Sequence, residues 1–187
     1  MASRDSQLTA NVCLALVAEG PTHGWALVRA LAPDADIGRI WSVTRPLVYR
    51  ALDGLVAGGL VSRAAPTPGQ GPERAILRAT PRGRRAVTTW LDEPVAHLRD
   101  VRTALLVKLA LRARRGLTSQ ALLLAQREAF APAIRTLTRR SAADDPVLLW
   151  RRETARAVDR FLQEAVRREH AMTAAATSSP AGGCGLL

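Results

Sequence analysis

The stretch from Trp41 to Arg63, WSVTRPLVYRALDGLVAGGLVSR, constrains the fold more than any other part of the chain. Thr44 suits a helix N-cap, Pro46 fits a first helical turn, and the glycines at positions 58 and 59 end the helix. Between these limits, apolar residues recur at helical spacing and form one stripe: Val48, Leu52, Leu55 and Val56. The sequence therefore predicts a short amphipathic helix over residues 45–58 that leads directly into a strand.

A hairpin and a further helix are expected after this segment. Residues 60–64 alternate apolar and polar side chains, the tract APTPGQGPE is dense in proline and glycine, and residues 74–79 are again strand-like. Thr80 can then cap a helix that has Pro81 in its first position. Helix, helix, strand, loop, strand and helix is the order of a winged helix-turn-helix domain.

The second face of the helix over residues 45–58 carries two guanidinium groups, a phenol and a carboxylate. These groups belong to Arg45, Tyr49, Arg50 and Asp53. They suit phosphate contacts and hydrogen bonds to base edges in a DNA major groove. A charged face that is merely solvated is the ordinary alternative for a short surface helix.

Three motifs together resemble the PadR family of winged-helix transcriptional regulators. LALVAEGPTHGWALVRAL is similar to the family's first helix, Pro-x-His-Gly-aromatic turn and second helix. SVTRPLVYRALDGLVAGGLV resembles its recognition helix, and RATPRGRR resembles the Leu-Thr-x-x-Gly that closes its wing. The resemblance covers residues 8–91, and it implies a DNA-binding regulator that acts as a homodimer.

We expect the DNA contacts to come from the recognition helix and from the arginines of the wing strands. The predicted DNA-binding residues are Thr44, Arg45, Pro46, Tyr49, Arg50, Arg63, Arg74 and Arg78. The wing tip, residues 66–72, contains no Lys or Arg, so insertion of a basic tip into a minor groove is not expected. The chain departs from the family at Pro46-Leu47, where a small residue and a Thr are usual, and at Trp25, where Tyr is common.

Charge and cysteine content are consistent with an intracellular DNA-binding protein. The net charge is +11, which favours a polyanionic partner, although most of the excess follows Asp92. Cys13 lies in an apolar helix and Cys184 near the C-terminus, so no disulfide framework is expected. No secretion signal or membrane-spanning segment is recognised, and we expect a cytoplasmic protein that does not bind membranes.

No enzyme motif, cofactor motif or metal-ligand spacing is recognised in the chain. His23, His97 and His170 are far apart in sequence, with no Cys or carboxylate at ligand spacing. The glycine-rich tract at residues 66–72 is explained by a hairpin tip rather than by a phosphate-binding loop. We therefore expect neither catalysis nor a bound metal or cofactor.

The C-terminal half is predicted to be helical. Helices are expected over residues 98–114, 118–138 with a kink or break at Pro132, and 147–172. The expected organisation is a winged helix-turn-helix domain at 1–92, a helical dimerisation or effector region at 93–172 and a disordered tail at 173–187. The fold class is thus mainly α with a small β-hairpin.

Six apolar residues of these helices are candidates for the dimer interface or for the core of the chain itself. They are Leu105, Leu109, Leu148, Val158, Phe161 and Leu162, and periodicity does not separate the two uses. The family resemblance also implies a small aromatic or amphipathic effector, for which Trp150 and Phe130 are the candidate contacts. Trp150 is placed on the inner face of its helix, and Trp25 and Trp41 are expected in the core of the winged domain.

The leading hypothesis is a homodimeric repressor that binds a palindromic operator in double-stranded DNA and is released by the effector. The alternative is a winged domain used as a protein–protein interaction module without specific duplex binding. The alternative predicts no duplex footprint and weak salt dependence, because few phosphates would then be neutralised.

Overall fold

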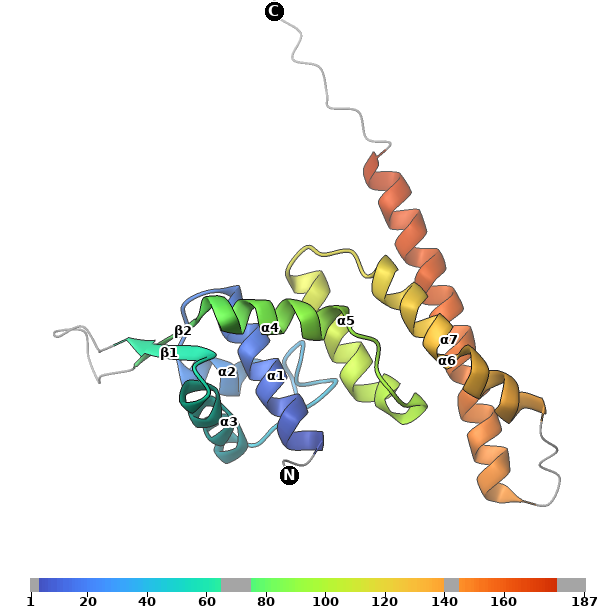
Figure 1. Ribbon diagram of the computed structural model, residues 1–187, viewed down its shortest axis with the longest axis horizontal. Coiled ribbons are helices and arrows are strands. Elements are labelled where there is room, and N and C mark those ends of the chain that lie inside the picture. Colours follow the sequence, from blue (N-terminus) through green and yellow to red (C-terminus); the bar gives the residue numbers. More distant parts are fainter. Residues whose placement is uncertain (1–3, 65–74, 140–144, 178–187) are drawn as a thin grey trace, which may run out of the picture. The chain divides into compact units, whose positions relative to one another are not determined.

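Helix α1 (Arg4–Glu19) lies within the core of the N-terminal unit of the computed structural model (Figure 1). The structure describes residues 4–64, 75–139 and 145–177. Residues 12–17 of α1 are all buried, which explains why this stretch of the helix is apolar around its whole circumference. Apolar side chains of α3 (Arg45–Ala57), α4 (Pro81–Asp92) and α5 (Leu106–Arg114) complete the same core.

The remaining elements of this unit give the winged order. Helix α2 (Gly24–Ala30) precedes α3, and the antiparallel strands β1 (Val61–Ala64) and β2 (Ile76–Ala79) follow it. Thr22, just before α2, adds two backbone hydrogen bonds to Leu77 of β2. The predicted fold class, mainly helical with a small hairpin, is confirmed.

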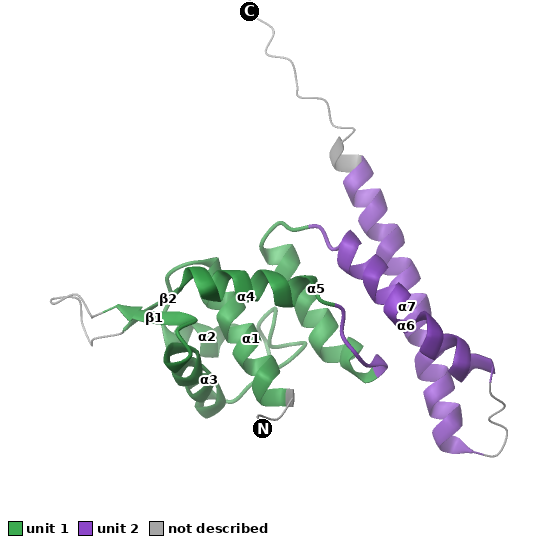
Figure 2. Cartoon of the chain, viewed as in Figure 1, with its two compact units in different colours: residues 1–93, 99–117 green, residues 94–98, 118–187 purple. Residues whose placement is uncertain are grey.

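The chain forms two units whose limits differ from the expected boundary after Asp92 (Figure 2). The first unit contains residues 1–93 and 99–117, and the second contains residues 94–98 and 118–187. Val107 and Leu111 of α5 are buried in the core of the first unit. The segment expected to begin the dimerisation region therefore belongs with the winged helix, because its apolar sides cover that core.

The helices of the C-terminal half differ in detail from the prediction. The expected helix over 98–114 consists of a 3₁₀ turn (Leu98–Asp100), a π-helical turn (Val101–Leu105) and α5. Helix α6 (Gln120–Arg139) continues through Pro132 without a break. Helix α7 (Pro146–Thr177) extends five residues past the expected start of the tail, and residues 178–187 lie outside the described part of the chain.

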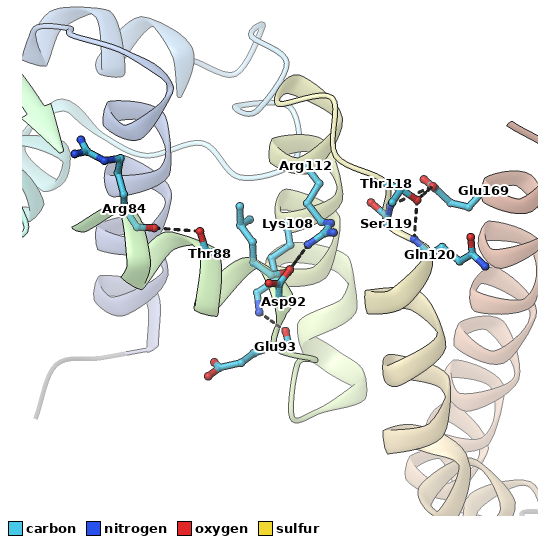
Figure 3. Close-up of polar contacts among 11 residues, drawn as sticks. Arg84, Thr88, Asp92, Glu93, Lys108, Arg112, Thr118, Ser119, Gln120 and Glu169 are labelled. Atoms are coloured by element: carbon cyan, nitrogen blue, oxygen red, sulfur yellow. Dashed lines mark hydrogen bonds and ion pairs between the residues drawn. The ribbon is translucent and has the colours of Figure 1, made fainter. Parts of the chain in front are cut away.

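Two buried cations of α5 hold the end of α4 (Figure 3). The Lys108 ammonium donates to the carbonyl of Glu93 and lies 5.1 Å from the centre of the Trp90 ring. Arg112 pairs with the Asp92 carboxylate and donates to the Leu91 carbonyl. Burial lowers the pKa of Lys108 to about 8, although the negative charges of Glu93 and Asp92 favour the ammonium form. Cations at this position also suit the negative end of the helix dipole.

The second unit is a hairpin of α6 and α7 with its own polar contacts. The side-chain amide of Gln126, fully buried, donates to the carbonyl of Val95 and accepts from its backbone N–H. The Glu169 carboxylate accepts from the hydroxyl of Thr118 and from the backbone N–H of Ser119 at the start of α6 (Figure 3). These contacts tie residue 95 to α6 and the beginning of α6 to α7.

Candidate nucleic-acid interface

Helix α3 has the predicted limits and a defined buried face. Thr44 is its N-cap residue with Pro46 in the first turn, but the Thr44 side chain makes no capping hydrogen bond. At the other end, Leu60 N–H donates to the Leu55 carbonyl and Gly59 N–H to the Val56 carbonyl, with Gly59 at φ 66°. These two bonds form a Schellman motif, in which the position with a left-handed backbone conformation is usually occupied by glycine. Three side chains on the inner face are buried: Val48, Leu52 and Leu55.

The outer face of α3 carries the predicted DNA-reading residues. Arg45, Pro46 and Arg50 are exposed, whereas the Tyr49 ring is half-buried. The Arg45 guanidinium lies 5.6 Å from the centre of the Tyr49 ring, so the two side chains form a cation–π pair. The first turn of α3 thus presents a positively charged group beside an aromatic ring.

Tyr49 explains the glycine of the Pro-x-His-Gly motif. A Cβ built on Gly24 would lie 2.8 Å from the Tyr49 Cε1 atom, closer than real side chains approach each other. Gly24 therefore lets the start of α2 approach the phenol ring. The turn between α1 and α2 and the outer face of α3 are linked through this contact.

The wing strands place their arginines on opposite faces of the hairpin. Arg63 pairs with Leu77 and Ser62 pairs with Arg78, and residues opposite each other in a ladder point to the same side. Leu77 is buried in the core, so Arg63 lies on the side of α3, and Arg78 is exposed on the other side. Arg74 lies outside the described residues. The predicted wing arginines thus do not form a single set around α3.

Arg63 connects the wing to α3 by an ion pair. Its guanidinium lies 2.5 Å from the carboxylate of Asp53 on α3. Both residues line a surface pocket of about 510 Å³, together with Arg45, Tyr49, His23 and Trp25. Five residues of α3 and β1 line this pocket, and they include the polar side chains of Arg45, Tyr49, Asp53 and Arg63, which can therefore contact the same ligand.

Trp25 is a correction to the sequence analysis. Its side chain is 46% exposed, and the Arg29 guanidinium lies 5.1 Å from its ring centre. Trp25 therefore belongs to the surface that includes Tyr49 and not to the core, while Trp41 is half-buried. Helix α2 has seven residues, too few for periodicity to show that Trp25 lies on its exposed side.

Thr80, Arg82 and Gly83 hold the turn that follows α3. Thr80 donates through its backbone N–H to the Leu60 carbonyl (3.0 Å) and through its hydroxyl to the Gly59 carbonyl (2.9 Å). The Gly83 N–H donates to the Thr80 hydroxyl oxygen, and Arg82 donates to the Gly58 carbonyl at the end of α3. The sequence analysis predicted only the capping role of Thr80. The Thr-x-x-Gly spacing was the signal that could have indicated its contacts with the turn after α3.

The candidate interface residues of the helical part divide by burial. Leu105, Leu162 and Val158 are buried and belong to the core of the chain. Leu109, Leu148 and Phe161 are half-buried. The two effector candidates are separated: Phe130 is buried, whereas Trp150 is 73% exposed and does not lie on the inner face of α7.

One side of α7 is apolar and exposed beyond what α6 covers. The buried side chains Ala155, Val158, Leu162 and Val166 form its inner face. Val147, Trp150, Ala157 and Phe161, at intervals of three, seven and four residues, share a neighbouring side. Val147, Trp150 and Ala157 are exposed, and Met172 near the end of α7 is also exposed. We call Val147, Trp150, Ala157 and Phe161 the α7 stripe.

The described residues contain no group of three or more His, Cys, Asp or Glu side chains placed to hold a metal ion. Among the helices that the structure describes, none combines the length and the apolar character needed to cross a bilayer. Burial raises the pKa of the Cys13 thiol to about 12, so this side chain is a core residue rather than a nucleophile.

Comparisons with known proteins agree with the winged-helix assignment. The model of the transcriptional regulator PadR-like family matches residues 13–89, which include α2, α3, both strands and most of α4. No curated protein matches the sequence significantly.

Several solved structures are similar to the chain at low identity. PadR of Bacillus subtilis in complex with operator DNA is 16% identical, with 84% of this chain and 97% of that chain covered and a TM-score of 0.44. The same protein in complex with p-coumaric acid is 15% identical, with 90% and 99% covered and a TM-score of 0.41. The protein smu.1604c of Streptococcus mutans UA159 is 13% identical, with 84% and 98% covered and a TM-score of 0.42.

Proposed function

Since residues 13–89 belong to the PadR-like family of transcriptional regulators, we propose that this protein is a homodimeric repressor that binds a specific palindromic operator. The observation that carries the proposal is the outer face of α3, where Arg45 and Arg50 are exposed beside Tyr49. A major groove about 12 Å wide admits a helix with such a face. The expectation that the protein acts as a regulator and not as an enzyme follows the family.

The proposed contacts divide between bases and backbone. Arg45 and Arg50 contact guanine edges or phosphates, and Tyr49 contacts the backbone or a thymine methyl group. Thr44 and Pro46, on either side of Arg45, contact the DNA backbone at the N-terminus of α3. Arg63 provides a phosphate contact on the α3 side of the wing.

Arg78 and Arg74 are the other two wing arginines proposed to contact phosphates. Arg78 is exposed on the opposite face of the hairpin, so it can reach only a different stretch of backbone. Arg74 is retained as a phosphate contact on the sequence argument alone.

A dimer is proposed because one winged domain reads few base pairs, and two domains related by a two-fold axis read a palindrome. The α7 stripe supports this assembly. Exposed large apolar side chains at helical spacing are typical of contact surfaces, and Trp150 has the most exposed of these side chains. Phe161, Leu148 and Leu109 are half-buried and can lose further surface in a dimer.

The effector is proposed to be a small aromatic or amphipathic molecule that binds the helical unit. Phe130 is buried and Trp150 belongs to the α7 stripe, so a ligand that contacts either residue has to displace neighbouring side chains or part of the proposed dimer contact. Release of DNA requires that the ligand binds one arrangement of the dimer more tightly than the other. p-Coumaric acid, the ligand bound in one neighbouring structure, is the first ligand to test, and a change of tryptophan fluorescence that is lost in Trp150→Phe would indicate binding near Trp150.

A gel-shift assay on the intergenic DNA beside the protein's own gene tests the proposal. At physiological salt, we expect a complex that survives an excess of unrelated duplex. Arg45→Ala and Arg50→Ala should each weaken it by about 1–3 kcal/mol. Arg160→Ala, which removes an exposed arginine from α7, is the matched control and should leave binding unchanged.

Three results would contradict this assignment of α3. Binding that the competitor abolishes would indicate only non-specific affinity. Equal binding by the α3 variants and the Arg160→Ala control would place the DNA contacts elsewhere. The absence of any duplex complex would favour the protein–protein interaction module.

A further inference from the structure

Asp53 is an acidic residue on a surface that is otherwise basic. It is the sole Asp or Glu within the described residues of α3, β1 and β2, and its side chain is 65% exposed. A carboxylate on a face that approaches DNA is repelled by phosphates unless it has a partner. In this structure the partner is Arg63, at 2.5 Å.

In the ion pair, the Asp53 carboxylate takes the place at Arg63 that a DNA phosphate could occupy. A guanidinium binds carboxylate and phosphate oxygens through the same donor geometry. The ion pair uses the Nη2 atom of Arg63, so a bidentate phosphate contact through both terminal nitrogens requires that this bond to Asp53 be given up. The two binding modes of Arg63 therefore compete.

We propose that Asp53 determines specificity by making the phosphate contact of Arg63 conditional on the base sequence. The inference rests on the proposed function of α3. At a correct site, Asp53 accepts a hydrogen bond from a base amino group such as cytosine N4, and Arg63 turns to a phosphate. At an incorrect site the carboxylate has no donor, so it either keeps Arg63 or remains unpaired beside phosphates. Asp53 thereby weakens non-specific binding more than specific binding.

The exposure of the pair agrees with such an exchange. The Arg63 side chain is 43% exposed, so water and salt screen its attraction to Asp53. Exposed ion pairs contribute about 0.2–1 kcal/mol, which corresponds to at most about a five-fold change in affinity. A contact of this strength discriminates between sites without preventing binding.

Asp53→Asn is the direct test, with a labelled mixed-sequence duplex as the non-specific probe. We expect the variant to bind this duplex about two- to five-fold more tightly than the unsubstituted protein at low salt. The gain should shrink as salt rises, because salt weakens the ion pair that the substitution removes. Affinity for the intergenic DNA beside the gene should not rise, so the ratio of specific to non-specific affinity falls.

Arg63→Ala separates this exchange from simple charge repulsion. On the intergenic DNA, where Arg63 is proposed to contact a phosphate, the variant should bind with a salt slope smaller by about 0.9, the value for one lost phosphate contact. In the Arg63→Ala background, Asp53→Asn should give a smaller gain than it gives alone. Glu128→Gln, which removes an exposed negative charge from α6, is the matched control and should leave both affinities unchanged.

Equal gains from Asp53→Asn with and without Arg63 would overturn the inference in favour of repulsion alone. An unchanged non-specific affinity in Asp53→Asn would also overturn it. In both cases the unsubstituted protein still binds its intergenic DNA, so the proposed function stands. If the unsubstituted protein binds no duplex, the proposed function and this inference fail together.

Discussion

Replacing Gly83 by Ala should destabilise the winged domain, because a side chain at this position meets backbone. A Cβ built on Gly83 would lie 2.1 Å from the Leu60 carbonyl oxygen and 3.3 Å from the Leu14 Cδ1 atom. The carbonyl oxygen belongs to the turn between α3 and β1, so it cannot rotate away as a flexible side chain would. The overlap is relieved only if α4 and this turn move apart.

The magnitude follows from the contacts at the turn. Moving apart strains the hydrogen bonds from the Thr80 backbone N–H to the Leu60 carbonyl and from the Thr80 hydroxyl to the Gly59 carbonyl, each contributing about 1 kcal/mol. Overpacking costs about a further 1–3 kcal/mol. Alanine recovers about 1 kcal/mol through its higher helix propensity. We therefore expect a net loss of about 2–4 kcal/mol in the free energy of unfolding.

Urea unfolding at fixed protein concentration measures this loss, and Gly54→Ala provides the matched control. Gly54 is also inside a helix, but a Cβ there has no atom within 4 Å. The control substitution should stabilise the protein by about 0.5–1 kcal/mol. If Gly83→Ala were neutral or stabilising like Gly54→Ala, the close approach of α4 to the turn would be refuted.

Three further predictions concern buried polar groups and the α7 stripe. Because the pKa of Lys108 is about 8 when folded and 10.5 in its reference state, the unfolded chain binds more protons between these values. Stability should therefore rise with pH over this window, and urea midpoints should show a smaller rise in Lys108→Met. Gln126→Leu leaves the backbone N–H and carbonyl of Val95 without their partner and should cost about 2–5 kcal/mol in urea unfolding; an unchanged midpoint would refute this contact. Trp150→Glu should weaken the dimer in sedimentation equilibrium without lowering helix content, and an unchanged dimer would exclude the stripe as the interface.

The recognition helix could be predicted from sequence because its signals are local. A proline in the first turn, an apolar stripe and paired glycines at the end each specify structure within a few residues. The observed helix, Arg45–Ala57, accordingly has nearly the predicted limits. The hairpin was predictable for the same reason, since alternation and a proline- and glycine-rich tract both act at short range.

The arrangement of charges around this helix could not be predicted in the same way. Whether Arg63 and Arg78 share a face depends on the register of the hairpin, and the pairing of Arg63 with Asp53 depends on how the hairpin packs against α3. Both are tertiary facts. Periodicity alone treated the two arginines as equivalent phosphate contacts.

Periodicity also overestimated what a helix buries. Helix α7 has an apolar surface wider than the part that α6 covers, so Trp150 was placed on the inner face but is exposed. Conversely, a helix that is apolar on several sides does not indicate which unit it will cover. Residues 99–117 were expected with the C-terminal helices and instead complete the core around α1.

Nuclease footprinting on the intergenic DNA beside the gene tests the central claim most directly, because it reports both sequence specificity and two-fold symmetry. We predict two protected half-sites related by a dyad, with their centres about one helical turn apart, near 10 base pairs, or a multiple of it. The protection should be lost in Arg50→Ala and retained in Arg160→Ala. Uniform protection without a preferred sequence, or none at protein concentrations that saturate non-specific DNA, would contradict the account.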